Sequence, residues 1–280
     1  MSKLDIYAFA DEASPSLEGQ IAAMLRNGLS GLEIRNVDGE NVSSISADKA
    51  REIKRKLDDA GLRVWSIGSP IGKIGIKKDD FNAHTEVFRH TLEIADILDA
   101  PNLRMFSFYI PAGKAPADYR QLVIDRLGTL CEIASGSGVK LCHENEKGIY
   151  GDNAARCLDL LTALPELNGI FDPANFIQCG QDTWQAWEML APHIHYMHIK
   201  DARTDGQVVP AGQGIGQIGR IAAAYLAQGG RAFTMEPHLA EFVGLGALER
   251  EGEKSLVGSF HYDSNDAAFD AACTAFKALV

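Results

Sequence analysis

The stretch Gly169-Ile170-Phe171-Asp172-Pro173-Ala174-Asn175-Phe176 decides the fold, because an apolar run ends abruptly at an aspartate and a proline. This pattern predicts a buried strand that presents one carboxylate at its C-terminal tip. Three other strand-like runs end in the same way, at Glu144, His198 and Glu236. Intervals of 28, 26 and 38 residues separate the four positions, and a βα unit of a parallel barrel takes about 30 residues. We therefore expect the four side chains to meet at one rim of a barrel.

Short apolar runs alternate with longer amphipathic runs along the chain, as strands and helices do in α/β proteins. The predicted strands cover residues 4–10, 30–35, 62–67, 102–108, 139–144, 168–172, 194–199 and 231–236. No linker interrupts this pattern, which favours a single α/β domain over residues 1–280. Eight units are the number found in a closed (β/α)8 barrel, whose active site lies at the C-terminal ends of the strands.

An open, doubly wound sheet is the alternative fold for such alternation. It usually carries a glycine-rich first turn, but the first turn here is Asp11-Glu12-Ala13-Ser14. The glycine-rich run from residue 212 to 219 comes late and lacks the following Lys-Ser/Thr of a phosphate loop. We predict a turn before a helix there, and a closed barrel overall.

The composition is that of a globular protein with a substantial core, with 46% hydrophobic and 23% charged residues. A formal net charge of -11 disfavours nucleic acid as a partner, because phosphate binding uses clustered lysines and arginines. A small molecule is the expected partner. We find neither a signal-peptide pattern nor a run of about 18 apolar residues, which predicts a cytoplasmic protein without a membrane partner. The five scattered cysteines are expected to be reduced, mostly buried thiols.

Three carboxylates and one imidazole at consecutive strand ends suit a divalent cation. Oxygen-rich ligands favour Mn²⁺ or Mg²⁺, and the imidazole also admits Co²⁺, Fe²⁺ or Zn²⁺. Taken singly, a strand-end acid is more often a helix N-cap or an ion-pair partner, and a single histidine is more often an interior residue. Their common placement favours a metal site, and the predicted ligands are Glu144, Asp172, His198 and Glu236.

Several motifs resemble those of the sugar phosphate isomerase/epimerase family of xylose-isomerase-like barrels, over essentially the whole chain. These motifs are His143-Glu144-Asn145-Glu146, Phe171-Asp172-Pro173-Ala174-Asn175, His198-Ile199-Lys200-Asp201-Ala202, Glu236-Pro237-His238, Gly31-Leu32-Glu33-Ile34-Arg35 and Gly68-Ser69-Pro70-Ile71-Gly72-Lys73. The resemblance implies a xylose-isomerase-like TIM barrel and a divalent metal, with Mn²⁺ favoured. It also implies a sugar or sugar phosphate as the small-molecule substrate, and a homo-oligomer, since relatives are often dimers or tetramers.

The resemblance also implies that Glu144 and Glu236 act as an acid/base pair while binding the metal. A hydrogen next to a carbonyl is too weakly acidic for a carboxylate unless the developing enediolate is stabilised, which a bound cation does. Asn175 stands where many epimerase relatives present a histidine to the substrate, and Arg203 matches a substrate-binding arginine approximately in spacing. Ketose 3-epimerase activity is therefore less strongly implied than isomerase or epimerase activity in general.

Four further residues are candidates for contacting the substrate. Glu33 ends the second predicted strand and could bind a sugar hydroxyl or form an ion pair with Arg35 or Arg104. Lys73 and Arg104 could hold a phosphate or carboxylate of the substrate, or form structural ion pairs. His238, two residues beyond Glu236, could face the pocket, whereas His143 should point to the opposite side of its strand from Glu144.

The leading expectation is a metal-dependent isomerase or epimerase that removes a proton next to a carbonyl through an enediolate. A lyase or dehydratase that acts on a keto-sugar or keto-inositol is the alternative, because the same enediolate can eliminate a leaving group. An apurinic endonuclease is disfavoured by the acidic charge and by too few strand-end histidines for a three-zinc cluster. A non-catalytic sugar-binding barrel is disfavoured by the presence of both glutamates.

Overall fold

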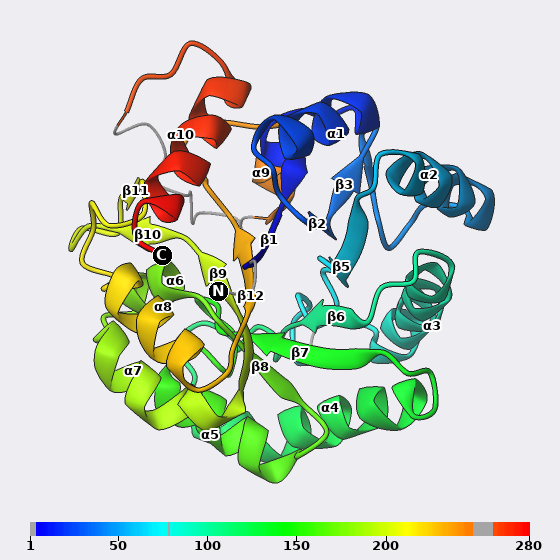
Figure 1. Cartoon of the computed structure of the whole chain (residues 1–280). Coiled ribbons are helices and arrows are strands. Elements are labelled where there is room, and N and C mark those ends of the chain that lie inside the picture. Colours follow the sequence, from blue (N-terminus) through cyan, green and yellow to red (C-terminus); the bar gives the residue numbers. More distant parts are fainter. Residues whose placement is uncertain (1–3, 78, 249–259) are drawn as a thin grey trace.

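Eight parallel strands close into a barrel in the computed structural model, which describes residues 4–77, 79–248 and 260–280 (Figure 1). The barrel strands are β1 (Asp5–Ala8), β2 (Gly31–Ile34), β5 (Arg63–Ile67), β6 (Asn102–Met105), β7 (Lys140–Glu144), β8 (Asn168–Phe171), β9 (Ile194–Ile199) and β12 (Ala232–Met235). Around the barrel they follow the order β1-β12-β9-β8-β7-β6-β5-β2, and β2 pairs with β1 to close it. The predicted α/β barrel fold is confirmed, and each predicted strand overlaps one observed strand.

Helices follow the strands and form an outer ring (Figure 1). They are α1 (Leu17–Arg26), α2 (Ala47–Asp59), α3 (Phe81–Ile97), α4 (Arg120–Ala134), α5 (Ala154–Ala163), α6 (Pro173–Gln178), α7 (Thr183–Leu190), α8 (Ile218–Ala227), α9 (Leu245–Leu248) and α10 (Asn265–Lys277). Short polar side chains begin several of them: the side chains of Ser46 and Asp182 accept hydrogen bonds from the backbone N–H groups of Lys49 and Gln185. None of the described helices is long and apolar enough to cross a membrane.

The loops at the C-terminal ends of the strands carry small elements that the hydrophobic pattern did not predict. Two antiparallel pairs, β3 (Asn36–Val37) with β4 (Glu40–Asn41) and β10 (Asp201–Ala202) with β11 (Val208–Val209), lie outside the barrel sheet. The 3₁₀ helices η1 (Ala10–Glu12) and η2 (Pro116–Tyr119) also follow barrel strands, whereas η3 (Ala191–His193) directly precedes β9. Pairs of two-residue strands give too little alternation to be recognised from sequence.

The glycine-rich loop before α8 wraps around the carboxylate of Asp201. The backbone N–H groups of Gly212, Gly214 and Gly216 donate to its two oxygens at 2.9–3.0 Å. A Cβ at position 214 or 216 would lie 2.3 or 2.5 Å from Asp201 Oδ1, so both positions require glycine. The amide groups of this loop therefore fix the chain after β9 and face an internal carboxylate.

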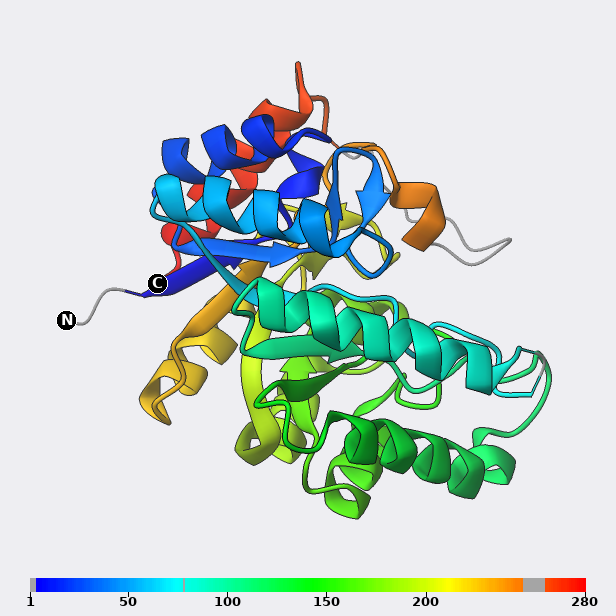
Figure 2. The same ribbon diagram turned by 90° about the vertical axis from the view of Figure 1, so that its right-hand side faces the viewer.

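The barrel interior is filled by side chains that alternate along the strands. Tyr7, Cys142, Ile170, Tyr196 and Ala232 form one buried cluster inside it. Because successive side chains of a strand point to opposite faces, residues two positions further along also point inward. Figure 2 shows the strands running toward the end of the barrel that carries α9, where these inward positions become polar.

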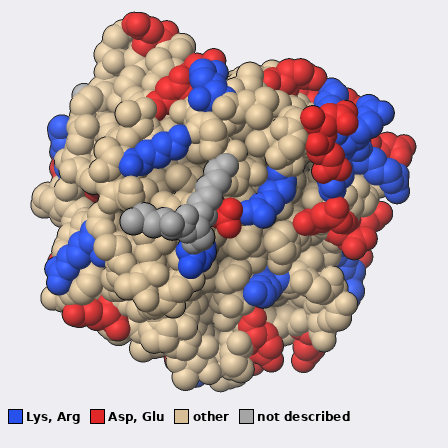
Figure 3. All heavy atoms as spheres, in the orientation of Figure 1, with Lys and Arg blue, Asp and Glu red and all other residues tan. Residues whose placement is uncertain are grey.

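Charged residues of both signs occupy the surface at the opposite end of the barrel (Figure 3). They are densest over α2, where Lys54 pairs with Asp58 and Lys56 pairs with Glu52. Solvent screens such exposed pairs, so they contribute little to stability. This face therefore carries mixed charges and not a patch of one sign.

Candidate metal centre and active site

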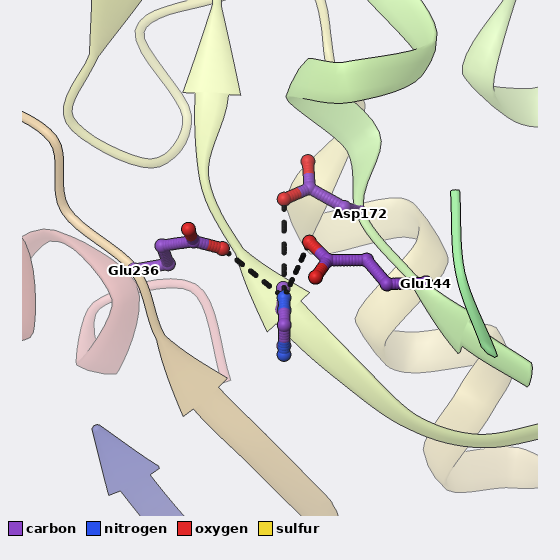
Figure 4. Close-up of side chains that lie close together, drawn as sticks. Glu144, Asp172 and Glu236 are labelled. Atoms are coloured by element: carbon purple, nitrogen blue, oxygen red, sulfur yellow. Dashed lines mark hydrogen bonds and ion pairs between the residues drawn. The ribbon is translucent and has the colours of Figure 1, made fainter. Parts of the chain in front are cut away.

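The four predicted metal ligands meet at the C-terminal end of the barrel. His198 Nδ1 lies 3.0 Å from Glu144 Oε1, 3.1 Å from Glu236 Oε2 and 4.0 Å from Asp172 Oδ2. Figure 4 shows the three labelled carboxylates pointing at one imidazole, with Glu236 on one side and Glu144 and Asp172 on the other. One ligand atom from each residue lies within 4.8 Å of the others, and all four residues are buried.

Strand order and local capping bring these residues together. Glu144 ends β7, Asp172 and Glu236 directly follow β8 and β12, and His198 lies near the end of β9, which β8 and β12 flank. Asp172 is also the N-cap of α6, since its Oδ1 accepts from the backbone N–H of Asn175 at 2.9 Å. Its other oxygen faces the cluster, so this side chain both caps a helix and can bind a cation.

The donor set fits a divalent cation. Asp172 Oδ2 and Glu236 Oε2 are buried without a hydrogen-bond partner in the described structure, and a buried unpaired carboxylate oxygen is costly. The ammonium of Lys200 lies 2.9 Å from the first and 3.4 Å from the second, close enough for ion pairing although neither contact has hydrogen-bond geometry. These oxygens already face positive charge and have lone pairs to spare, as metal ligands require.

The electrostatics of the cluster reflect burial opposed by close charges. Burial raises the pKa of Asp172 to about 7, and the charges of Glu236 and Glu144 also raise it. The Lys200 ammonium lowers this pKa but does not outweigh them. Burial also opposes ionisation of Glu144, but His198 and Arg104 outweigh it and hold the pKa of Glu144 at about 2. The pKa of Glu236 is well below its usual range, because Lys200 and His198 outweigh its burial. Two of the three carboxylates are therefore ionised at neutral pH before any cation binds.

Glu33 lies beneath the cluster and orients His198. Its Oε2 is 3.1 Å from His198 Nε2, and its Oε1 accepts hydrogen bonds from Tyr196 Oη at 2.9 Å and Ser66 Oγ at 3.3 Å. With Nε2 held by Glu33, Nδ1 is the nitrogen turned to the carboxylates. Burial opposes a charge on His198, but Glu144 and Glu33 raise its pKa well above the usual value. A carboxylate behind a ligating histidine is a common arrangement at metal sites.

Replacing Glu33 with glutamine is expected to weaken metal binding by about 10–100-fold, the usual cost of losing such an outer partner. The amide can still accept one hydrogen bond from His198, but it no longer offsets positive charge on the imidazole. Competition with a chelating dye measures the dissociation constant. Glu18→Gln is the matched control, because Glu18 is an exposed carboxylate on α1 that pairs with Lys56. Equal affinities in the two variants would contradict this role for Glu33.

Asn175 and Arg104 both contact the Glu144 carboxylate. Arg104 Nη1 donates to Glu144 Oε2 at 3.0 Å, and Arg104 Nη2 donates to the carbonyl of Gly68 at 3.1 Å. The Asn175 amide donates to Glu144 Oε1 at 3.3 Å and to the carbonyl of Asn145 at 2.9 Å. Both residues are buried, and the two oxygens of Glu144 therefore have different surroundings.

Three other residues named from the sequence lie further out. Lys73 is half-buried and pairs with Glu146 at 2.9 Å, with its ammonium 4.5 Å from the centre of the Phe106 ring. Arg203 is exposed and lies over the Phe260 ring. His143 points away from the cluster, as strand alternation predicts, and its Nε2 is 2.9 Å from Ser107 Oγ. None of these four contacts is with one of the four predicted metal ligands.

Next to Glu236 lies a second group of charged residues. Arg35 donates to both oxygens of Asp11, at 2.9 and 3.0 Å, and to Glu12 Oε1 at 3.2 Å. The backbone N–H of His238 donates to Glu12 Oε2 at 2.6 Å. Burial raises the pKa of Glu12 to about 8 despite Arg35, and burial together with the Lys200 charge holds the pKa of His238 well below its usual value. His238 thus lies between Glu12 of this second group and Glu236 of the four predicted ligands.

Sequence reasoning did not identify Lys200 or Glu12 as site residues. Lys200 stands two positions after His198, so strand alternation was the signal that could have placed it on the same inner side. Glu12 belongs to η1, where no strand pattern applies. A groove of about 650 Å³ lies elsewhere, between the ends of α4 and α5 and the start of β7, and contains none of the site residues.

Comparisons with known proteins agree with this architecture. No curated protein matches the chain in sequence. Among solved structures, an L-ribulose 3-epimerase is 19% identical, with 100% of this chain and 96% of that chain covered and a TM-score of 0.76. The IolI protein with a bound zinc atom is 14% identical, with coverage of 99% and 98% and a TM-score of 0.74. The probable 3-DHS dehydratase AsbF from Bacillus anthracis is 17% identical, with coverage of 98% and 99% and a TM-score of 0.72.

At these identities the likenesses establish the fold. An epimerase and a dehydratase are both enzymes, so this barrel supports catalysis in its structural neighbours. The family model described as xylose isomerase-like TIM barrel matches residues 21–239, most of the chain. The eight-stranded barrel and the sequence match together show that the chain belongs to the xylose isomerase-like TIM barrel family.

Proposed function

We propose that the protein is a divalent-cation-dependent isomerase or epimerase that acts on a small sugar, keto-sugar or sugar phosphate. In this proposal Glu144, Asp172, His198 and Glu236 hold the cation, with Mn²⁺ favoured by the oxygen-rich donor set. The observation that carries it is the placement of Glu144 and Glu236 on opposite sides of His198, each with one oxygen within about 3 Å of Nδ1.

Each of these two glutamates keeps its second oxygen out of the cation cluster. Glu144 Oε2 accepts from Arg104, whereas Glu236 Oε1 lies 3.5 Å from His238 Nε2 and 3.6 Å from Arg35 Nη1. Two carboxylates that flank one centre can remove a proton from one face of a substrate carbon and return it to the other. The looser contacts leave Glu236 Oε1 the more available proton acceptor.

When bound, the cation would supply Lewis-acid stabilisation to the substrate oxygen that gains charge as the proton leaves. The chain's own residues would do the rest. Glu33 fixes the imidazole of His198, and Lys200 adds positive charge beside Asp172 and Glu236. Asn175 and Arg104 would hold Glu144 in place, and Phe9 packs edge-on against the His198 ring at 5.3 Å between centroids. Burial of these groups strengthens each electrostatic contact.

The substrate class is supported by the neighbours that are named as sugar epimerases, including the L-ribulose 3-epimerase. Lys73, Arg203 and His238 remain proposals for substrate contacts at the rim. Lys73 already pairs with Glu146, so a phosphate or carboxylate of the substrate would have to compete with that carboxylate. The acidic charge of the chain supports a small molecule rather than nucleic acid as the partner.

The test is hydrogen exchange in D₂O. We expect the protein with Mn²⁺ to exchange one carbon-bound hydrogen of a keto-sugar or keto-sugar phosphate, because exchange reports removal of the proton next to the carbonyl even before a product is identified. Proton NMR follows the loss of that signal across a set of such compounds.

Protein treated with a chelator is the control and should show no exchange. Exchange that is accompanied by an unsaturated product would replace the isomerase with a lyase. If none of the keto-sugars and phosphates exchanges although the protein holds its metal, the proposed reaction is wrong.

A further inference from the structure

Three buried groups meet on the outer side of Glu236, away from His198. They are Glu12 in η1, Glu236 after β12 and His238 two residues later, and β1 and β12 are neighbours in the barrel. His238 Nε2 lies 3.4 Å from Glu12 Oε1 and 3.5 Å from Glu236 Oε1. One ligand atom from each lies within 4.8 Å of the others. Two ligand atoms bound at the roughly 2.0–2.2 Å typical of zinc–nitrogen and zinc–oxygen bonds lie about 3.3–3.6 Å apart in tetrahedral geometry, which matches the two separations from His238 Nε2.

The Nε2 atom of His238 is aimed into this triangle and has no hydrogen-bond partner among the described residues. The side chain is only 9% exposed, so solvent does not readily supply the partner that this nitrogen lacks in the described structure. The ring is held in position, since it stacks on Phe242 with 5.6 Å between centroids and 17° between planes. The backbone N–H of His238 is anchored on Glu12. A buried nitrogen fixed in this direction and left unpaired indicates a missing ligand.

Two cations reach the triangle from its sides. Arg35 lies with Nη2 at 3.2 Å from Glu12 Oε1 and Nη1 at 3.6 Å from Glu236 Oε1. The Lys200 ammonium lies 3.4 Å from Glu236 Oε2, on the side of the four-residue cluster. The Nε and Nη2 atoms of Arg35 are also bound to the carboxylate of Asp11. One guanidinium therefore contacts three buried acidic side chains, of which Glu12 would lose its proton when a cation binds. The nearby arginine also means that any additional cation binds here more weakly than at the four-ligand cluster.

We propose that Glu12, Glu236 and His238 form a second divalent-cation site, adjacent to the first and sharing Glu236. An imidazole with two carboxylates suits Zn²⁺ or Mn²⁺. The proposal goes beyond the proposed function, which needs one cation, and meets it only at Glu236. With Oε2 facing the first site and Oε1 facing the second, occupation of both removes the oxygen that would accept a proton. The second site is thus inhibitory, filled at higher cation concentration than the first.

Equilibrium dialysis of the full chain against Zn²⁺ or Mn²⁺, with elemental analysis of both compartments, tests this inference. We expect two equivalents per chain with separate affinities. His238→Asn should abolish the weaker equivalent and keep the tighter one. Asparagine suits the left-handed backbone at this position (φ 44°), and its shorter side chain cannot reach the position of Nε2. Asp172→Asn should do the reverse, weakening the tighter equivalent alone.

The outcomes separate the two sites. A single equivalent that Asp172→Asn weakens and His238→Asn retains would overturn the second site while supporting the first, with a proton on Glu12 satisfying His238 instead. A single equivalent that only His238→Asn loses would support the second site and contradict the first. No bound metal in the unmodified protein would overturn both. Glu12→Gln, which keeps the side-chain shape and an acceptor for the His238 N–H, provides a second variant with the same expected loss, and circular dichroism checks that each variant is folded.

Discussion

Replacing Glu236 with glutamine is expected to lower kcat by about 10²–10⁴-fold, the usual contribution of general acid–base catalysis. Glutamine keeps the shape of the side chain and can offer a carbonyl oxygen in place of Oε2, which faces His198 Nδ1 at 3.1 Å. It loses the basicity of Oε1, the oxygen with the loosest contacts in the cluster. Turnover and metal content are measured on the same preparations, and metal content should change much less than kcat.

Glu144→Gln is the companion variant, because Glu144 flanks His198 from the other side. For an epimerase with one base per face, each variant should stop interconversion yet leave hydrogen exchange of one substrate epimer. An isomerase with a single base, or a lyase, would not show this asymmetry. Near-normal turnover in both variants would contradict the acid–base pair even if the metal is bound as proposed.

Replacing Arg35 with methionine is expected to destabilise the protein by about 3–5 kcal/mol, the range for removing one partner of a buried ion pair. Arg35 is 1% exposed and binds Asp11 and Glu12, and its guanidinium lies 4.4 Å from the centre of the Phe9 ring. Methionine keeps most of the apolar contacts but leaves the carboxylates without their cation. Urea unfolding followed by circular dichroism measures the loss.

The loss should grow above about pH 8. Burial raises the pKa of Glu12 to about 8 in the folded protein even beside Arg35, and without that cation the folded pKa must rise further. A carboxyl whose folded pKa is raised contributes stability below its unfolded pKa and loses it as the pH rises through the folded pKa. At pH 6 Glu12 is protonated in both proteins, whereas at pH 9 it is ionised only beside Arg35.

Arg51→Met is the matched control, since Arg51 pairs with Asp48 on the exposed face of α2, where both side chains are more than half exposed. That pair should contribute about 0–1 kcal/mol. Equal urea midpoints for Arg35→Met and Arg51→Met at both pH values would show that the buried cluster contributes nothing to stability.

Local patterns in the sequence were enough to predict the barrel and to bring the four ligands together. The eight strands are short, mostly apolar runs, four of which end at or beside a predicted ligand, and the C-terminal ends of parallel barrel strands share one rim. The alternation of side chains also placed His143 away from Glu144, as the structure has it. These inferences hold because they depend on neighbours along the chain and on a repeat that any parallel barrel imposes.

The pairing of oxygens with their partners was not predictable in this way. Glu33 was a candidate for a sugar hydroxyl or for an ion pair with Arg35 or Arg104, and its hydrogen bonds go to His198, Tyr196 and Ser66. These contacts join residues on β2, β5 and β9. Which side chain lies behind which depends on how far neighbouring strands are staggered, and a single strand carries no record of that stagger.

The sequence by itself determined the eight-fold alternation and the four strand-end side chains that meet at one rim, because periodicity and chain order are local properties. Only the tertiary structure decided that Lys200 lies against Asp172 and Glu236, and that Glu12 meets His238 across 226 residues of chain. Closing the barrel sets β1 beside β12, so the loop after the first strand and the loop after the last come into contact. The surroundings of Glu236, on which its proposed role as a base depends, follow from that closure.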